Sequence, residues 1–247
     1  MGALDEFSLP VRLFLRAYPW RRIDPVPWAP LKKPLSQCRM ALVSSAGFVL
    51  PDQPPFDPTT RGGDVSFREI PASVDVHTFI ESHRSEVFDH SGIRRDPNLA
   101  FPIDRVRELA VRGRIGSVNH RHLSFMGSIT APGRLIRQTG PPAARLLVED
   151  AVDVALVVPV CPMCNQTMCL IAAELERQGI STAVIQLLRE VAERVRPPRA
   201  LFVPFNHGYP LDRPDDPPRQ HAVIEAALKM LEDSQLTPPA LTSFRGN

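Results

Sequence analysis

Apolar runs alternate with amphipathic stretches through the second half of the chain, and this alternation is the clearest structural signal in the sequence. Residues 152–160 (VDVALVVPV) are almost all apolar and rich in β-branched valine, which is typical of a strand covered on both faces. The same half predicts further strands at 182–187 and 200–205, and helices at 165–178, 188–195 and 217–233. This alternation predicts an α/β fold with a mainly parallel sheet and helices on both faces, in flavodoxin-like or Rossmann-like layers.

The first half of the chain has shorter patterns. Residues 39–50 (RMALVSSAGFVL) predict a buried strand that runs into a loop, and Val65–Ile70 alternates as a second strand would. Pro102–Arg112 predicts a helix, because proline suits a first helical turn and apolar residues recur on one face. Another helix is predicted to begin at Gly140, residues 79–86 fit a strand or a loop, and IGSVNHRHLSFMG has no regular pattern.

The distribution of proline separates an N-terminal arm from the rest of the chain. There are 27 prolines against 13 glycines, and many prolines lie in residues 1–60 and 197–218. Such stretches predict extended, ordered loops rather than helices. We therefore expect residues 1–37 to form a wrapping N-terminal arm, with a short helix near 8–17, and residues 38–247 to form a single α/β domain.

Composition and charge narrow the classes of function. Lys+Arg 29 against Asp+Glu 27 gives a net charge of +2 with no clustered basic face, which does not favour nucleic-acid binding. No apolar run approaches the roughly 18 residues of a membrane helix, and the N-terminus does not have the pattern of a signal peptide. We therefore expect a cytoplasmic protein that binds neither nucleic acids nor membranes. Neither GxGxxG nor GxxxxGK[ST] occurs, so nucleotide binding has no support.

One edge of the predicted sheet is the expected place for a ligand, because parallel strands bring their carboxyl ends together there. Ser44 and Ser45 end the first strand, where they can donate hydrogen bonds to a substrate or cap the next element. His207 is a further candidate for the substrate side of this edge. The loops expected to converge there follow Val43, Val160, Leu187 and Phe205.

The run Cys161-Pro162-Met163-Cys164 follows the most apolar strand and opens the next helix. A helix N-terminus carries about half a positive charge, which favours a thiolate. In such motifs the pKa of cysteine falls from about 8.5 to between roughly 3.5 and 7.5. A second cysteine three positions on can resolve the adduct as an internal disulfide. The motif therefore predicts a redox-active pair in which Cys161 is the nucleophile and Cys164 the resolving thiol.

Metal binding is the alternative chemistry for the same residues. Cys161, Cys164 and Cys169 have the spacing C-x2-C-x4-C, and a histidine could complete a zinc or iron site in a metal-binding or non-catalytic partner protein. Structural zinc sites usually have two such pairs, and an iron–sulfur cluster needs a fourth thiolate, whereas Cys38 is distant in sequence. The cysteines could also be inert, since a free cysteine such as Cys169 is commonly a packed core residue.

Four stretches of the chain share motifs with a known family. Residues 94–129 contain DPN-x-x-FP-x-DR-x-REL followed by SFMG, and residues 153–167 read DVALVVPVCPMCNQT. Residues 179–185 (GISTAVI) and 201–214 (LFVPFNHGYPLDRP) follow in the same order. Together they resemble the selenoprotein B family of glycine/sarcosine/betaine reductases and D-proline reductase, over residues 38–233.

This resemblance implies a thiol-dependent oxidoreductase that cleaves a C–N bond α to a carboxylate, with a disulfide as acceptor and a dithiol as reductant. In such reductases a pyruvoyl group on a partner subunit activates the amine, and a selenolate attacks the α-carbon. The selenocysteine position matches Cys161, and Cys164 matches the resolving thiol. No pyruvoyl-generating segment is recognisable, so a pyruvoyl-bearing partner would supply that group. A thioredoxin-like protein is a further expected partner, and no bound cofactor is expected in this chain.

Other candidate site residues lie in the stretch NHRHLSFMG. His120 or His122 could hold a proton for the thiolate or for a leaving amine, because histidine titrates near pH 6.5; each could equally be a surface or structural residue. Arg121 could bind a substrate carboxylate with two parallel hydrogen bonds, or be solvated. The apolar face of residues 221–233 suits either the core or a contact in a homo-oligomer.

Overall fold

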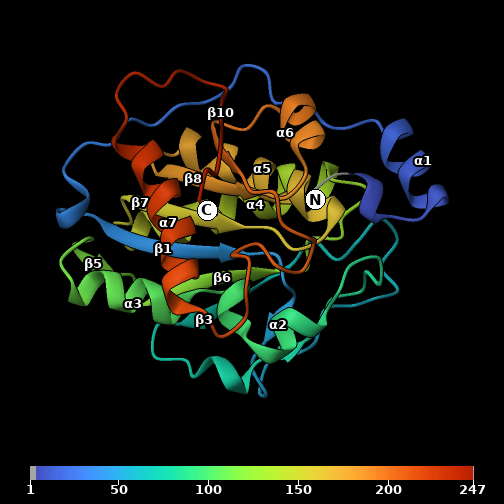
Figure 1. The fold of residues 1–247 in the computed structure, drawn as a ribbon, viewed down its shortest axis with the longest axis horizontal. Helices are drawn as coiled ribbons and strands as arrows, with labels where there is room; N and C mark the ends of the chain where they lie inside the picture. Colours follow the sequence, from blue (N-terminus) through green and yellow to red (C-terminus); the bar gives the residue numbers. More distant parts are fainter. Residues whose placement is uncertain (1–3, 247) are drawn as a thin grey trace.

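The computed structural model describes residues 4–246, which are built around an eight-stranded sheet (Figure 1). Its strands are β1 (Arg39–Ser44), β3 (Phe67–Pro71), β5 (Ser117–Val118), β6 (Arg121–Phe125), β7 (Val154–Val158), β8 (Ser181–Gln186), β9 (Arg199–Phe202) and β10 (Ala240–Ser243). They follow the order β10-β9-β8-β7-β1-β6-β3, and β5 pairs with β1 beside this path. All pairs are parallel except β3 with β6. The expected α/β fold with a mainly parallel sheet is confirmed.

Strands β1 and β7 form the centre of the sheet. Every residue of β7 is buried, and β1 is buried after Arg39, as expected for strands covered on both faces. They pair in parallel, with Val43 opposite Val157 and Ser44 opposite Val158. The chain continues from β1 toward β6 on one side and from β7 toward β8 on the other. The topological switch point of the sheet therefore lies between β1 and β7.

Strands β5, β6 and β10 are the three that the sequence pattern did not predict, and the first two lie in the stretch IGSVNHRHLSFMG. β6 contains His122 and Ser124, which are buried polar residues. The Leu42 amide donates to His122 Nδ1 at 2.9 Å, and Ser124 Oγ donates to the Phe48 carbonyl at 2.6 Å. These bonds give His122 Nδ1 and Ser124 Oγ partners inside the sheet, so polar residues occupy positions of β6 that an alternating strand pattern would fill with apolar ones. β10 is a short edge strand, and only its pairing with β9 identifies it.

A small hairpin lies beside the main sheet. It pairs β2 (Phe48–Val49) with β4 (Ile80–Glu81) in antiparallel fashion. Of residues 79–86, for which strand and loop were both open, only Ile80–Glu81 is strand and the rest is loop. The hairpin ties this loop to the connection that follows β1, because the Ser82 amide also donates to the Gly47 carbonyl at 2.8 Å.

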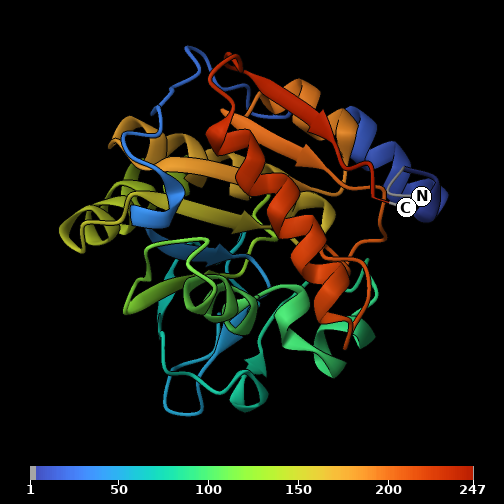
Figure 2. The same ribbon diagram turned by 60° about the vertical axis from the view of Figure 1, so that its left-hand side comes forward.

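Helices cover both faces of the sheet (Figures 1 and 2). The α-helices are α1 (Leu9–Ala17), α2 (Ser91–Arg95), α3 (Ile103–Val111), α4 (Gly140–Glu149), α5 (Pro162–Arg177), α6 (Arg189–Val195) and α7 (Pro217–Glu232), and a π-helical turn, Leu135–Thr139, precedes α4. Short 3-10 turns are Leu4–Glu6, Leu35–Gln37, Val76–Thr78 and Pro97–Leu99. α3 and α7 pack on one face, and α4 and α6 pack against α5 on the other. Among the described residues, no helix has the length and apolar character needed to span a membrane.

The N-terminal arm carries the expected short helix, α1, and then continues as extended chain along the domain. The Arg21 amide donates to Gln166 Oε1 of α5 at 2.7 Å, and the Ile23 amide donates to the Val195 carbonyl at 2.8 Å. Further on, the Trp28 ring lies 3.5 Å from the guanidinium carbon of Arg199. The arm is therefore packed onto the layer of α5 and α6 and reaches the start of β9.

A buried ion pair joins α5 to β9 beneath the arm. Arg199 Nη1 lies 2.5 Å from Glu176 Oε1, and neither side chain is more than 2% exposed. Glu176 also accepts from the Thr182 amide at 2.7 Å and from the Ala29 amide. Burial raises the pKa of Glu176 while the Arg199 charge lowers it. These bonds compensate a carboxylate that is otherwise removed from water.

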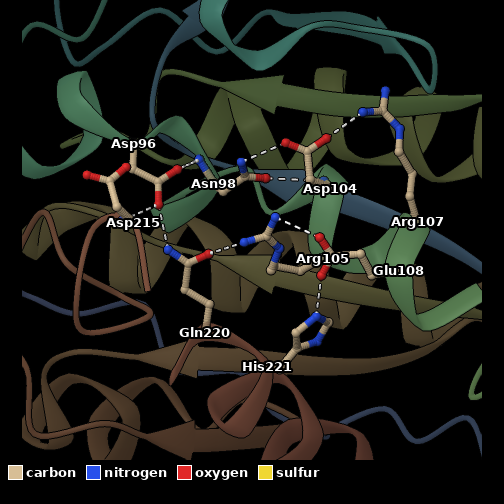
Figure 3. A network of polar contacts seen from close by, with 9 residues as sticks. All are labelled: Asp96, Asn98, Asp104, Arg105, Arg107, Glu108, Asp215, Gln220 and His221. Atoms are coloured by element: carbon tan, nitrogen blue, oxygen red, sulfur yellow. Dashed lines mark hydrogen bonds and ion pairs between the residues drawn. The ribbon is translucent and has the colours of Figure 1, made fainter. Parts of the chain in front are cut away.

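A second polar network holds α7 against α3 (Figure 3). Gln220, at the start of α7, donates to Asp96 at 2.6 Å and accepts from Arg105 of α3 at 3.3 Å. Arg105 donates to Glu108 at 2.8 Å, and Glu108 faces His221 of α7. The charged positions of the DPN-x-x-FP-x-DR-x-REL stretch therefore have structural partners in this network.

Replacing Arg199 with Leu should destabilise the protein strongly, because the Glu176 carboxylate then stays buried without its cation. Loss of one member of a buried pair costs about 3–5 kcal/mol. Arg177→Leu is the matched control, since it removes an exposed pair with Glu174 on the same helix and should cost less than about 1 kcal/mol. Denaturant unfolding measures both variants, and similar losses in the two would contradict this account.

Candidate functional site

The two cysteines of the CPMC run lie at the N-terminus of α5, directly after β7. The helix begins at Pro162, three residues earlier than the sequence pattern predicts, so Cys161 is its N-cap residue. Cys161 Sγ accepts a hydrogen bond from the Cys164 amide at 3.2 Å. Both side chains are completely buried. The pair is thus held inside the protein at the positive end of a helix.

The loops expected to converge do so around this first helical turn. The Ser45 carbonyl, after β1, lies 3.7 Å from Cys164 Sγ. The Leu187 amide, after β8, donates to Asn165 Oδ1 of α5 at 2.9 Å. The Gly208 amide, in the loop after β9, donates to the Val160 carbonyl at 2.8 Å. The site therefore occupies the carboxyl edge of the sheet at its switch point.

Glycine at position 127 allows a further loop to reach the sulfur. A Cβ atom on Gly127 would lie 2.7 Å from Cys164 Sγ and 2.5 Å from Ser45 Cβ, closer than such atoms approach. The Gly127 amide donates to the Ser45 carbonyl at 3.2 Å, and its carbonyl accepts from Thr167 Oγ1 of α5 at 2.8 Å. The SFMG motif thus ends in a residue whose backbone seals the thiol site.

His83 is the functional candidate that the sequence pattern missed. Its Nε2 atom lies 3.4 Å from Cys164 Sγ. It comes from the loop after β4, and Gly47 permits the approach, because a Cβ atom on Gly47 would lie 3.0 Å from the His83 amide nitrogen. Residues 79–86 carry no motif, and 81 residues separate this histidine from its sulfur. No local signal indicated this contact.

The pKa values of the two cysteines are shifted in opposite directions. Burial raises the pKa of Cys164, but the hydrogen bonds of Cys161, His83 and Ser45 together lower it well below its usual range. Burial and the neighbouring Cys164 raise the pKa of Cys161 well above its usual range. The negative charge of the singly ionised pair therefore lies on Cys164. This differs from the expectation that the helix N-terminus would ionise Cys161.

His207 lies beside the thiol helix, at the edge where it was expected. Its Nε2 atom accepts from Asn165 Nδ2 at 3.2 Å, and its Nδ1 atom faces the Glu6 carboxylate of the N-terminal arm. A cavity of about 420 Å³ adjoins it, lined by Glu6, Phe7, Ser8, Val11, Asn206, His207 and the loop residues Glu86–Asp89. This cavity borders the site through His207 and is large enough for a small molecule.

The other predicted substrate residues do not converge with the thiols. Arg121 begins β6, and its guanidinium binds Asp150 at 2.7 Å and Glu69 at 3.0 Å, at the opposite edge of the sheet. His120 is largely exposed and lies 3.6 Å from the same Asp150. His122 is buried in β6, and burial, followed by the charges of Arg107 and His120, lowers its pKa to about 3. His120 precedes β6, and Arg121 and His122 begin it, at the edge of the sheet away from the sulfurs. All three residues therefore contact structural partners instead of the thiols.

The two serines after the first strand are part of the loop structure. Ser44 Oγ accepts from the Ala46 amide at 3.2 Å, which shapes the turn after β1. Ser45 Oγ donates to the Val158 carbonyl at 3.4 Å, and its own carbonyl faces Cys164. Both serines are buried. Ser45 therefore contacts the site, whereas Ser44 supports the loop that carries it.

The other two cysteines, Cys38 and Cys169, are not part of the sulfur cluster. Cys169 is buried farther along α5, and burial raises its pKa. Cys38 precedes β1, and burial together with Asp153 raises its pKa to about 11. The ligand atoms that approach one another within 4.8 Å belong to His83, Cys161 and Cys164. Cys169 is thus not part of the cluster that the metal-binding alternative had assumed.

Comparison with known proteins extends the sequence resemblance. Residues 9–159 match the family described as glycine/sarcosine/betaine reductase selenoprotein B. The chain is 32% identical over 210 residues to the D-proline reductase subunit gamma of Acetoanaerobium sticklandii, and the match covers 85% of each protein. No solved structure matches the chain significantly.

Longer relatives match over part of their length. The chain is 28% identical over 227 residues to the sarcosine reductase complex component B subunit beta of Peptoclostridium acidaminophilum, covering 89% of the chain and 51% of the relative. It is 26% identical over 227 residues to the glycine reductase complex component B subunit gamma of Carboxydothermus hydrogenoformans, covering 88% and 51%. The chain therefore spans about half the length of these two relatives.

Mild oxidation should form one disulfide, between Cys161 and Cys164, and leave Cys38 and Cys169 as thiols. The pair lies in one cluster, whereas burial raises the pKa of the other two thiols. Differential alkylation and peptide mass spectrometry measure the outcome, with Cys161→Ala as the control that cannot form the disulfide. A disulfide containing Cys169, or equal alkylation of all four cysteines, would contradict the assignment.

Proposed function

Because the chain belongs to the glycine/sarcosine/betaine reductase selenoprotein B family, we propose that it is the thiol-bearing subunit of a reductase complex. In this proposal Cys161 stands where the family has selenocysteine, and Cys164 is the resolving thiol. The relatives are named as subunits of D-proline, sarcosine and glycine reductases. The reaction proposed for this chain is correspondingly the reductive cleavage of a C–N bond next to a carboxylate.

The observation that supports this proposal best is the isolated sulfur pair at the switch point of the sheet. Cys161 caps the helix and accepts the Cys164 amide, so the two sulfurs are neighbours on one turn. Five connections enclose them: those after β1, β4, β6, β8 and β9. Such enclosure excludes water from a reactive thiolate and strengthens every hydrogen bond to it.

The chemistry requires two electrons and two protons from the pair. The Cys161 sulfur attacks the substrate carbon and forms a C–S bond, while the C–N bond breaks and the amine leaves with one proton. The Cys164 sulfur then attacks the Cys161 sulfur and forms the disulfide. The carbon fragment leaves with the C–S electrons and takes the second proton. The substrate is reduced, the dithiol is oxidised, and an external dithiol or a thioredoxin-like protein restores the pair.

Because the sulfurs are buried, a substrate held by a partner protein needs a route to them. In this proposal, a substrate activated on a partner subunit, such as one that carries a pyruvoyl group, approaches through the cavity beside His207. The rim of this cavity consists of the N-terminal arm and the loop of Glu86–Asp89, both at the surface. Local displacement of these segments would expose Cys161 to the activated carbon.

Cys161→Ser should abolish turnover, since a serine hydroxyl is hardly ionised near neutral pH. Cys164→Ser should instead trap the substrate fragment on Cys161, because no thiol remains to resolve the adduct. The experiment is intact-mass spectrometry of both variants incubated with small amino acids and any co-purified partner subunit. A single adduct per chain is expected in Cys164→Ser only, and external dithiothreitol should release it.

Cys169→Ala is the control for this pair of variants. It removes a buried thiol of the same helix that lies outside the sulfur cluster, so turnover should persist within about twofold of the unmodified protein. Normal turnover of Cys164→Ser without added thiol would refute the two-cysteine mechanism.

A further inference from the structure

The ring of His83 is held in one tautomer by the backbone beside it. The Ser85 amide donates a hydrogen bond to His83 Nδ1 at 3.1 Å. A nitrogen that accepts a hydrogen bond carries no proton, so the proton of the neutral ring lies on Nε2. That atom faces Cys164 Sγ at 3.4 Å. The geometry makes His83 a hydrogen-bond donor to the sulfur.

The segment that imposes this tautomer is itself fixed. The Ser85 carbonyl accepts from His90 Nε2 at 2.8 Å, and His90 Nδ1 faces the Glu81 carboxylate. Glu81 in turn binds Arg94 at 2.7 Å near the surface. An unbroken chain of polar contacts thus runs from Arg94 to the buried sulfur through both main-chain groups of Ser85. Such a chain orients each of its members.

We propose that His83 is a catalytic residue that holds the negative charge of the reduced pair on Cys164. The inference rests on the function proposed above and adds a third reacting group to it. On ionisation the Cys164 proton passes to solvent, and His83 keeps its own Nε2 proton and directs it at the thiolate. A hydrogen bond to the charged form favours that form, so His83 acts without becoming an imidazolium.

This assignment gives Cys164 two successive tasks. As Cys161 attacks the substrate carbon, the Cys164 thiolate accepts the proton of Cys161 and passes it to the leaving amine. The Cys164 sulfur is then again a thiolate, stabilised by His83, and attacks the Cys161 sulfur to form the disulfide. One proton leaves with the amine, and the carbon fragment takes the other from solvent, so protons and electrons balance.

Few other groups can control the charge on this sulfur. Cys161 Sγ is the titratable neighbour on the same helix, and the Ser45 carbonyl, at 3.7 Å, is the acceptor available to the thiol form. On the side of His83, the Phe88 ring packs edge-on at 5.0 Å and the His90 ring lies 6.2 Å away. The Ser45 hydroxyl also lowers the pKa of Cys164, but it donates to the Val158 carbonyl as well. Among the described residues, His83 is therefore the ring donor that distinguishes Cys164 from Cys161.

The same tautomer argues against a metal at this cluster. A metal-binding histidine offers an unprotonated nitrogen to the metal and usually donates its other ring N–H to an oxygen acceptor. In His83 the cluster-facing nitrogen carries the proton, and the other nitrogen meets a donor, the Ser85 amide. Three ligand atoms lie within 4.8 Å of one another, but the imidazole has the wrong protonation pattern for coordination.

The test is the thiolate absorbance near 240 nm of the reduced protein as a function of pH, for His83→Ala, His83→Gln and the unmodified chain. Loss of a hydrogen bond to a charged group should raise the midpoint of the first ionisation in His83→Ala by about 1–2 pH units. Glutamine can donate to the sulfur and accept from Ser85, so His83→Gln should recover at least half of that shift. The exposed His77→Ala is the matched control and should leave the midpoint unchanged.

An unchanged midpoint in His83→Ala would overturn the proposal. If that variant does not fold, ¹⁵N chemical shifts of the His83 ring in the unmodified reduced protein decide it: an Nε2-protonated ring supports the proposal, and an Nδ1-protonated ring or an imidazolium refutes it. Stoichiometric Zn²⁺ binding that is lost in His83→Ala would also refute it. None of these measurements uses substrate, so a failure of the reductase proposal, seen as unaffected turnover in Cys161→Ser, is distinguishable from a failure of this one.

Discussion

Complete burial of two sulfur atoms is the constraint on which the rest of this site depends. A buried thiolate has no water to solvate it, so the protein must supply every polar partner. The parallel register of β1 and β7 meets this requirement, because it brings the Ser45 carbonyl and the start of α5 to the same edge. Gly127 then closes the site from the side of β6, at a distance that no larger residue permits. The fold therefore both positions the cysteines and supplies the polar groups that replace water around their sulfur atoms.

The distribution of charge within the pair follows from this enclosure. A helix N-terminus ordinarily favours a thiolate on its capping cysteine. Here Cys161 receives hydrogen bonds from the amides of Met163 and Cys164, whereas Cys164 receives side-chain hydrogen bonds from Cys161, His83 and Ser45. Two buried sulfurs this close cannot both be charged, since like charges raise the cost of the second ionisation. The sulfur with more hydrogen-bond donors takes the charge, and the other sulfur keeps its proton.

The N-terminal arm belongs to this site more closely than its position in the sequence suggests. Glu6 faces His207, and His207 contacts Asn165 one turn from Cys161. The arm thereby lines the cavity beside His207, together with the loop of Glu86–Asp89.

Sequence alone determined the layers of the fold and the position of the cysteine pair in it, because both have local causes. Apolar runs such as residues 152–160 specify strands buried on two faces, and a cysteine pair directly after such a strand has to lie at the carboxyl edge of the sheet. What the sequence could not determine was which distant groups meet the sulfurs. His83 has no motif and belongs to a short hairpin, and its contact with Cys164 depends on the approach that Gly47 permits. Conversely, His122 lies in a suggestive motif but is a buried strand residue, because β6 pairs with β1. Contacts between residues far apart in the chain are set by strand pairing and loop packing, and only the tertiary structure decided them.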